Sequence, residues 1–244
     1  MVCLLAVLLG AVVLVRNKPE DIGLTPDGET AGPAVEMEKT ESRREREKGY
    51  EMSEIRRILS RPTAWFIGGF SAANTFTTGM LQTHQIAYLR DINYTAITAA
   101  STLSFMSIFS VVGSLIFGTL AMRINLRYLA SAAFVVQMAG LTILLTSKNL
   151  GLIYVFAALQ GISAGSLTTA MPTFIGTYYP RDRYAQAMGV VFPFQVISNA
   201  VSATTAGLVF DATGTYVPAF IMAVVVSFSG MFFAFMARPV RNTD

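Results

Sequence analysis

Residues 64–89 read AWFIGGFSAANTFTTGMLQTHQIAYL, and this stretch determines how the rest of the chain is interpreted. Its 26 residues carry no formal charge and end at the charged pair Arg90-Asp91. An uncharged run of this length is too long and too apolar for a typical helix in a soluble core. The sequence therefore predicts a membrane-spanning helix here.

This predicted span carries its polar residues on one side. At about 100° per residue, six of them fall within roughly a third of the helix circumference: Ser71, Asn74, Thr75, Thr78, Gln82 and Gln85. His84 lies off this stripe, nearer the apolar face. Unpaired amides are costly in hydrocarbon, so the stripe requires either partner helices that bind it or a water-filled cavity.

The composition places the whole chain in the membrane class. Hydrophobic residues make up 53% and charged residues 14% of the sequence. The net charge of +3 does not indicate nucleic-acid binding, because the cations lie in one mixed-charge segment and in short turns. A single Cys3 and a single His84 exclude an intrachain disulfide and a Cys/His metal cluster.

The N-terminal quarter precedes the predicted membrane bundle. Residues 1–15 are apolar but too short to span a bilayer, so we expect the end of a truncated helix in a chain that starts part-way through a longer gene. Residues 16–62 are rich in charges and turn formers and predict a cytoplasmic linker. Near its end, Ile55, Ile58 and Leu59 favour a short helix on the membrane surface, or else a solvated charged helix.

Six apolar runs follow the linker within residues 63–238, which predicts six membrane crossings before a cytoplasmic tail at 239–244. The runs are Ala64 to Leu89, Ala96 to Met122, Leu129 to Thr146, Leu150 to Tyr178, Ala185 to Phe210 and Tyr216 to Ala237. A cytoplasmic linker and C-terminus leave only Arg90 and Lys148 on the opposite side. By the positive-inside rule this predicts a multi-pass protein of the cell membrane.

Two further patterns concern how the spans pack. Gly161 and Gly165 form a G-x-x-x-G pair, which lets helix backbones approach closely. The fifth span carries a second polar stripe of Gln195, Asn199 and Ser202 close to Pro193, a proline that predicts a kink. Two stripes with amides favour a shared cavity, with interhelical hydrogen bonds as the alternative.

The second and fifth spans end alike. Gly118 is followed seven residues later by Asn125, and Gly207 by Gly214. Three crossings separate the two turns, so they lie on opposite sides of the membrane, as in two three-helix units of inverted topology. The predicted fold is an all-α membrane protein with a six-transmembrane-helix bundle of two inverted three-helix repeats, preceded by a partial helix and a cytoplasmic loop.

These residues resemble the major facilitator superfamily, whose turn motif reads G-x-x-x-D-R-x-G-R-R. Gly118, Arg123 and Arg127 match it, whereas Met122, Asn125 and Leu126 depart from it. Asp211, Gly214 and Tyr216 look like the D-x-x-G-x-Y before the last helix of many members. The segments RNKPEDIGLTPDG at 16–28 and HQIAYLRD at 84–91 are similar to segments of bacterial members related to monocarboxylate and oxalate/formate carriers.

The resemblance implies helices seven to twelve of a twelve-helix carrier, whose partner is an N-terminal six-helix half. Such a carrier moves a small-molecule substrate across the lipid bilayer by alternating access. We expect this chain to line the path with Asn74, Thr78, Gln82, Gln85, Gln160, Gln195 and Asn199. His84 either takes up the coupling proton, since the unperturbed pKa of histidine lies near neutral pH, or is hydrogen-bonded between helices.

The main alternative is a truncated, transport-inactive or scaffold membrane protein that needs a partner half. An enzyme is disfavoured, because the sequence has no H-E-x-x-H motif and no mid-span acid to complete a catalytic set with His84. No catalytic residue, cofactor, metal site or nucleic-acid partner is therefore expected.

Overall fold

The structure is a computed structural model that describes residue 53 and residues 55–238. The sequence predictions for residues 1–15, for nearly all of 16–62 and for 239–244 lie outside these described residues. The described residues 55–238 contain the whole predicted membrane bundle.

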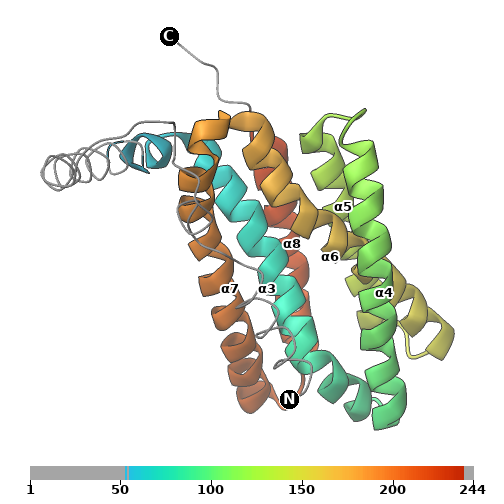
Figure 1. Cartoon of the computed structure of the whole chain (residues 1–244). Helices are drawn as coiled ribbons and strands as arrows, with labels where there is room; N and C mark the ends of the chain where they lie inside the picture. The colour runs from blue at the N-terminus through green and yellow to red at the C-terminus, as the bar shows by residue number, and fades with distance from the viewer. Residues whose placement is uncertain (1–52, 54, 239–244) are drawn as a thin grey trace, which may run out of the picture. The chain divides into compact units, whose positions relative to one another are not determined.

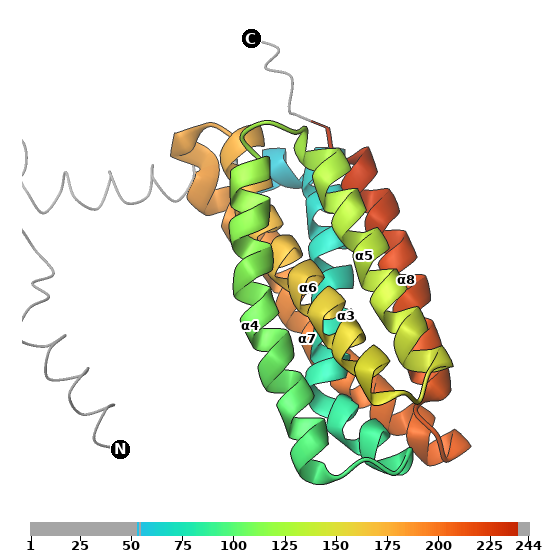
Figure 2. The same cartoon turned by 90° about the vertical axis from the view of Figure 1, so that its right-hand side faces the viewer.

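The described residues fold into six long α-helices that run alternately up and down (Figures 1 and 2). Short turns join them, together with the 3-10 helix η3 (Arg181–Arg183). The helices are α3 (Pro62–Asp91), α4 (Ala96–Leu120), α5 (Leu126–Thr146), α6 (Leu150–Tyr178), α7 (Tyr184–Thr213) and α8 (Val217–Met236). The described segment contains no strand. The predicted all-α fold is confirmed, and each apolar run corresponds to one helix.

Local sequence sets several helix ends. The side chains of Thr95, Asn125 and Asn149 each accept a backbone N–H at the start of α4, α5 and α6. Gly214 ends α7 in the left-handed conformation, with φ of 69°, which glycine adopts without the steric cost of a Cβ. These residue types let the chain reverse within three to five residues between helices.

Five of the six helices are long and apolar enough to cross a membrane, and α3 is the exception by composition. The polar stripe lowers its hydropathy, yet at 30 residues α3 is as long as α7. The two helices pack side by side along their lengths, because Gly68 meets Phe194 and His84 meets the Ala203 carbonyl. That α3 crosses the membrane as a sixth span stays a prediction, which its length and its packing beside α7 favour.

The packing is arranged as two inverted triplets, α3–α5 and α6–α8. Helix α4 packs against α6 in the other triplet, and its counterpart α7 packs against α3. Likewise α5 packs against α6 as α8 packs against α3, while α5 and α8 pack on each other. Exchanging the triplets leaves this pattern unchanged, which confirms the predicted inverted repeats.

The apolar core forms two clusters. One contains Phe70, Phe117, Phe134 and Phe174. The other contains Met80, Leu144, Phe156 and Phe220. Ile58, just before α3, is only 2% exposed and packs into the first cluster, so residues 55–59 form a docked helical turn, not a merely solvated helix.

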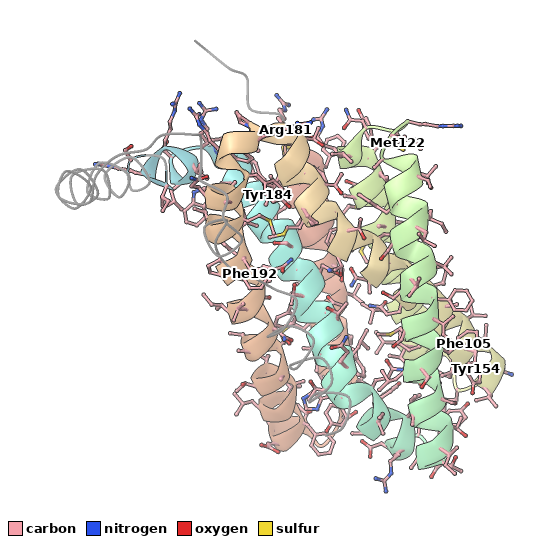
Figure 3. The ribbon with its side chains drawn as sticks, viewed as in Figure 1. Phe105, Met122, Tyr154, Arg181, Tyr184 and Phe192 are labelled. Atoms are coloured by element: carbon pink, nitrogen blue, oxygen red, sulfur yellow. The ribbon has the colours of Figure 1, made fainter. Side chains whose placement is uncertain are left out.

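The two ends of the bundle differ in charge. Within the described residues, arginines gather at the end that holds the α4–α5 turn, η3 and the C-terminus of α8: Arg56, Arg57, Arg61, Arg123, Arg127, Arg181, Arg183 and Arg238. The opposite end carries Arg90 and Lys148. In Figure 3 Arg181 and Met122 mark the arginine-rich end. This asymmetry matches the distribution that the sequence predicts.

Candidate functional site

A polar cavity of about 190 Å³ lies between α3, α4 and α6. Each helix contributes residues from near the middle of its length, so the cavity lies at mid-depth of the bundle. Its lining is Thr78 and Gln82 from α3, Met106, Ser107 and Ser110 from α4, and Ala164 and Thr168 from α6. Five of these seven side chains are polar, which is unusual at the centre of an apolar bundle.

The cavity offers hydrogen bonds without charge. Thr78 Oγ1 donates to the Asn74 carbonyl at 2.9 Å, and Ser107 Oγ donates to the Leu103 carbonyl at 3.0 Å. Their hydroxyl lone pairs therefore remain free to accept from a bound molecule. The exposed carboxamide of Gln82 adds both a donor and an acceptor. The lining can therefore bind a small polar molecule by hydrogen bonds.

Helix α7 places the amide of Asn199 against α3. The Asn199 side chain lies over Gly79, directly next to Thr78 in α3, where a Cβ would collide with Asn199 Oδ1. Ser198 Oγ donates to the Ala72 carbonyl at 2.7 Å and fixes the two helices together. Gln195 lies one turn before Asn199 on α7 and is partly exposed. The α7 stripe thus packs against Gly79 of α3, through Asn199 and Ser202.

Three other predicted path residues lie away from the cavity. Gln85 is buried and its Nε2 donates to Thr102 Oγ1 at 2.8 Å, which joins α3 to α4. Gln160 is fully buried beside Gly140 of α5, and neither atom of its amide has a hydrogen-bond partner among the described residues. Asn74 is buried with its Oδ1 likewise unpaired. The α3 stripe therefore serves both roles, helix pairing and cavity lining.

His84 joins α3 to α7. Its Nε2 lies 3.0 Å from the Ala203 carbonyl, and its ring centroid lies 5.2 Å from that of Tyr216. A carbonyl oxygen can only accept, so Nε2 carries the proton in this contact. His84 thus makes an interhelical hydrogen bond, which is one of the two alternatives that the sequence offered. A role in proton coupling stays a prediction.

The motif residues lie at two turns on opposite ends of the bundle. Gly118 faces open space on α4, and Arg123 is exposed in the turn that follows. The Arg127 N–H donates to Asn125 Oδ1 at 3.2 Å. Asp211 is exposed in the last turn of α7, before Gly214. The turns are equivalent by position in the two triplets and opposite in side, as predicted.

Two tyrosines just outside the spans stay neutral near pH 7. Burial raises the pKa of the Tyr179 phenol, although the nearby Arg61 opposes this. Burial also raises the pKa of Tyr216, and the carboxylates of Asp91 and Asp211 raise it further. Neither residue adds charge at the membrane boundary.

Sequence reasoning missed part of the cavity. Ser107, Ser110 and Thr168 line it but were not among the predicted path residues. The spacing of Ser107 and Ser110 at i, i+3 was a usable signal, since it puts both hydroxyls on one helix face. Outside the cavity, the sequence predictions also did not include Gln137 of α5, a fully buried amide with no hydrogen-bond partner among the described residues.

Comparison with known proteins gives a consistent family. The family model of the Major Facilitator Superfamily matches residues 83–244, from within α3 through α8. Monocarboxylate transporter 12 of Rattus norvegicus is 26% identical over 167 residues, which cover 65% of this chain and 34% of that protein. The Homo sapiens protein of that name is 26% identical over 167 residues, 65% of this chain and 32% of its own.

Monocarboxylate transporter 12-B of Danio rerio is 25% identical over 160 residues, 64% of this chain and 34% of its own. The chain thus spans about a third of the length of these relatives. The region that the family model matches includes all the turns between the six helices and five of the seven residues that line the cavity. The chain is a multi-pass membrane protein that belongs to the Major Facilitator Superfamily.

Proposed function

We propose that this chain is the C-terminal half of a secondary carrier, which moves a small solute across the membrane by alternating access. The polar cavity at mid-depth carries the proposal, because carriers of this kind bind their substrate near the bilayer midplane between rocking bundles. Thr78, Gln82, Ser107, Ser110 and Thr168 would be this chain's share of the binding site.

The bundle also has the surfaces that a second half requires. Helices α4 and α7 are the least buried of the five apolar spans. Ile108 and Val111 on α4, and Val196 and Ile197 on α7, are exposed. An N-terminal six-helix half would cover part of these two helices and close the cavity. Residues 16–62 would then be the linker between halves, and the arginine-rich end of the bundle would face the cytoplasm.

The cavity favours an uncharged solute, or a charged solute that residues outside this chain neutralise. The relatives are monocarboxylate transporters by name, but no cation lines this cavity. A carboxylate buried without a cation costs far more than a hydroxyl or an amide. If the carrier takes a monocarboxylate, the other half would have to supply the positive charge. No chemical step is needed, so the proposal is transport without catalysis.

A transport-inactive scaffold is the second candidate, because one bundle alone has nothing to rock against. Uptake assays in proteoliposomes separate the two. We would compare the chain alone with the chain co-produced with an N-terminal six-helix half, using a panel of small solutes that includes lactate. Uptake only with both halves supports a carrier. Uptake by neither supports the scaffold, and uptake by the chain alone contradicts the half-carrier proposal.

Cavity variants then test whether this site binds the solute. Thr168→Val keeps the shape and removes a hydroxyl from the cavity, so we expect the KM for uptake to rise about tenfold. Thr142→Val is the matched control, because Thr142 is exposed on α5 outside the cavity. Equal KM values for the two variants would exclude the cavity as the binding site.

A further inference from the structure

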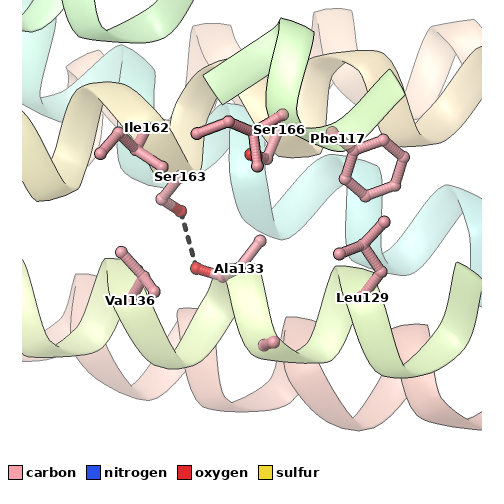
Figure 4. Close-up of a pocket in the computed structure, with 9 residues that line it drawn as sticks. Phe117, Leu129, Ala133, Val136, Ile162, Ser163 and Ser166 are labelled. Atoms are coloured by element: carbon pink, nitrogen blue, oxygen red, sulfur yellow. Dashed lines mark hydrogen bonds between the residues drawn. The ribbon is translucent and has the colours of Figure 1, made fainter. Parts of the chain in front are cut away.

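An apolar groove lies between α4 and α5, with α6 as its floor (Figure 4). Its volume is about 140 Å³. The lining is Ile116 and Phe117 from α4, Leu129, Ala132, Ala133 and Val136 from α5, and Ile162, Ser163 and Ser166 from α6. An apolar cavity of about this size stays dry and takes apolar ligands.

The two serines in the floor do not make the groove polar. Ser163 Oγ donates to the Ala133 carbonyl at 2.9 Å, the contact drawn in Figure 4. Ser166 Oγ donates to the Gly113 carbonyl at 3.1 Å. Both side chains are also buried, so their oxygen lone pairs are hardly accessible from the groove. A polar solute would therefore find few hydrogen bonds here, whereas a hydrocarbon chain loses nothing.

The groove and the polar cavity lie on different sides of α6. On α6 the floor residues Ser163 and Ser166 lie within about 60° of one another, whereas the cavity residue Thr168 lies about 140° or more from both. Since a carrier's polar cavity faces the partner half, the groove on the other face of α6 meets lipid. The inference that the groove meets lipid rests on the proposed function. The apolar lining of the groove and the positive charge at its end do not depend on it.

Positive charge lies at one end of the groove. Phe117 is within one turn of the end of α4 at Leu120, and Leu129 is within one turn of the start of α5. The turn between these helices, residues 121–125, reads AMRIN and contains Arg123 but no acid. Arg123 is exposed, and Arg127 follows at the start of α5. A phosphate beside this turn would meet cations without a competing carboxylate.

We propose that this groove binds an anionic glycerophospholipid, with one acyl chain between α4 and α5 and the phosphate at Arg123. The apolar lining favours an acyl chain, and Arg123 in the turn favours an anionic headgroup. A lipid bound in this way would hold α4 and α5 together at the turn, where the chain has Met122 in place of the acid that the family motif prefers.

Native mass spectrometry of the purified 244-residue chain tests the proposal. The chain is taken from micelles containing equal amounts of phosphatidylglycerol and phosphatidylcholine, and retained lipid is counted. We expect one phosphatidylglycerol to be retained at least fivefold over phosphatidylcholine. Equal retention of the two lipids would overturn the role of the charged turn.

Two pairs of variants separate the groove from the turn. Val136→Phe fills the groove and should lower retention of both lipids about tenfold, whereas Val135→Phe, at a neighbouring exposed position outside the groove, should not. Arg123→Gln should remove the preference for phosphatidylglycerol, whereas Lys148→Gln at the other end should keep it. Unchanged retention in Val136→Phe, or unchanged preference in Arg123→Gln, would overturn the proposal.

These outcomes do not depend on transport. If the chain fails to support uptake with a partner half while lipid retention follows the pattern above, the proposed function fails and the lipid site stands. The reverse result removes the lipid site alone.

Discussion

Two helix contacts are equivalent by the inverted repeat but built differently. In the first, α4 meets α6 through Gly113, Gly161 and Gly165, and each glycine lies against a backbone carbonyl of the other helix. We call this the glycine seam. In the second, α7 meets α3 through the side chains of Ser198 and Asn199 and through His84, and we call it the side-chain seam. In the first seam the two backbones lie close together, whereas in the second seam side chains bridge to the backbone of the other helix.

The difference shows which contact tolerates change. A backbone carbonyl cannot turn away from an added methyl group, so the glycine seam fixes α4 and α6 as a unit. Asparagine and histidine side chains can rotate, so the side-chain seam leaves α3 and α7 freer to adjust. The polar cavity lies between α3 and the glycine seam, so we expect α3 to shift more readily at the cavity than α4 and α6 do.

Gly165→Ala should have the largest effect on the free energy of unfolding. A Cβ at this position would collide with the Ser110 carbonyl of α4, and overpacking of this kind costs about 3 kcal/mol. Thermal denaturation of the purified chain in detergent measures the loss. Gly207→Ala is the control, since nothing lies within 4 Å of a Cβ there. Equal melting temperatures for the two variants would contradict the account of the glycine seam.

Gly79→Ala should have a smaller effect, of about 1–2 kcal/mol, because the added methyl group meets the mobile side chain of Asn199. The double variant Gly79→Ala, Asn199→Ala should recover part of the loss, since the second change removes the nearest obstructing atom while Ser202 Oγ stays 2.7 Å from the added Cβ. A double variant that is no more stable than Gly79→Ala would mean that Asn199 is not the side chain that opposes the added methyl group.

His84→Leu removes the donor to the Ala203 carbonyl and should cost about 1 kcal/mol. His84→Gln can still donate and should cost less. In a carrier with both halves, the pH dependence of uptake distinguishes the two hypotheses for His84. If the hydrogen bond between α3 and α7 is the only role of His84, uptake by the His84→Gln variant should keep its pH dependence. Loss of that dependence, with exchange retained, would instead assign proton coupling to His84.

Ser198→Ala should have the smallest effect, about 0.6 kcal/mol, which is the mean for interhelical hydrogen bonds in membranes. Ser114→Ala is its counterpart in the glycine seam, where Ser114 Oγ donates to the Gly165 carbonyl at 3.1 Å. The two losses, measured by thermal denaturation, should agree within a few tenths of a kcal/mol. A much larger loss at Ser198 would mean that one side-chain bond holds α3 to α7.

The fold followed from the sequence because long apolar runs, broken by Asn125, Asn149 and Gly214, have few alternatives in a bilayer. The helix Leu150–Tyr178 matches the predicted run at both ends. The charged positions also determined the two ends of the bundle. The inverted repeats rested on one shared glycine in the sequence, and only the packing of α4 on α6 and α7 on α3 confirmed them.

The site followed only in part, because an amide in a span has two uses that the sequence does not separate. Thr78 and Gln82 line the cavity, whereas Gln85 pairs with Thr102 and Gln160 is buried against α5. The difference depends on which neighbouring helix each side chain faces, and that is set by tertiary packing. The serines of α4 show the same limit, since small residues serve both packing and lining.

The inverted repeat is tested most directly by the sidedness of its two equivalent turns. In a Cys3→Ser background, Arg123→Cys and Ala212→Cys place one thiol after α4 and one at the end of α7. We expect a membrane-impermeant maleimide to label position 212 from outside intact cells, and position 123 only after the cytoplasmic face is exposed. Labelling of both positions from the same side would contradict two inverted triplets.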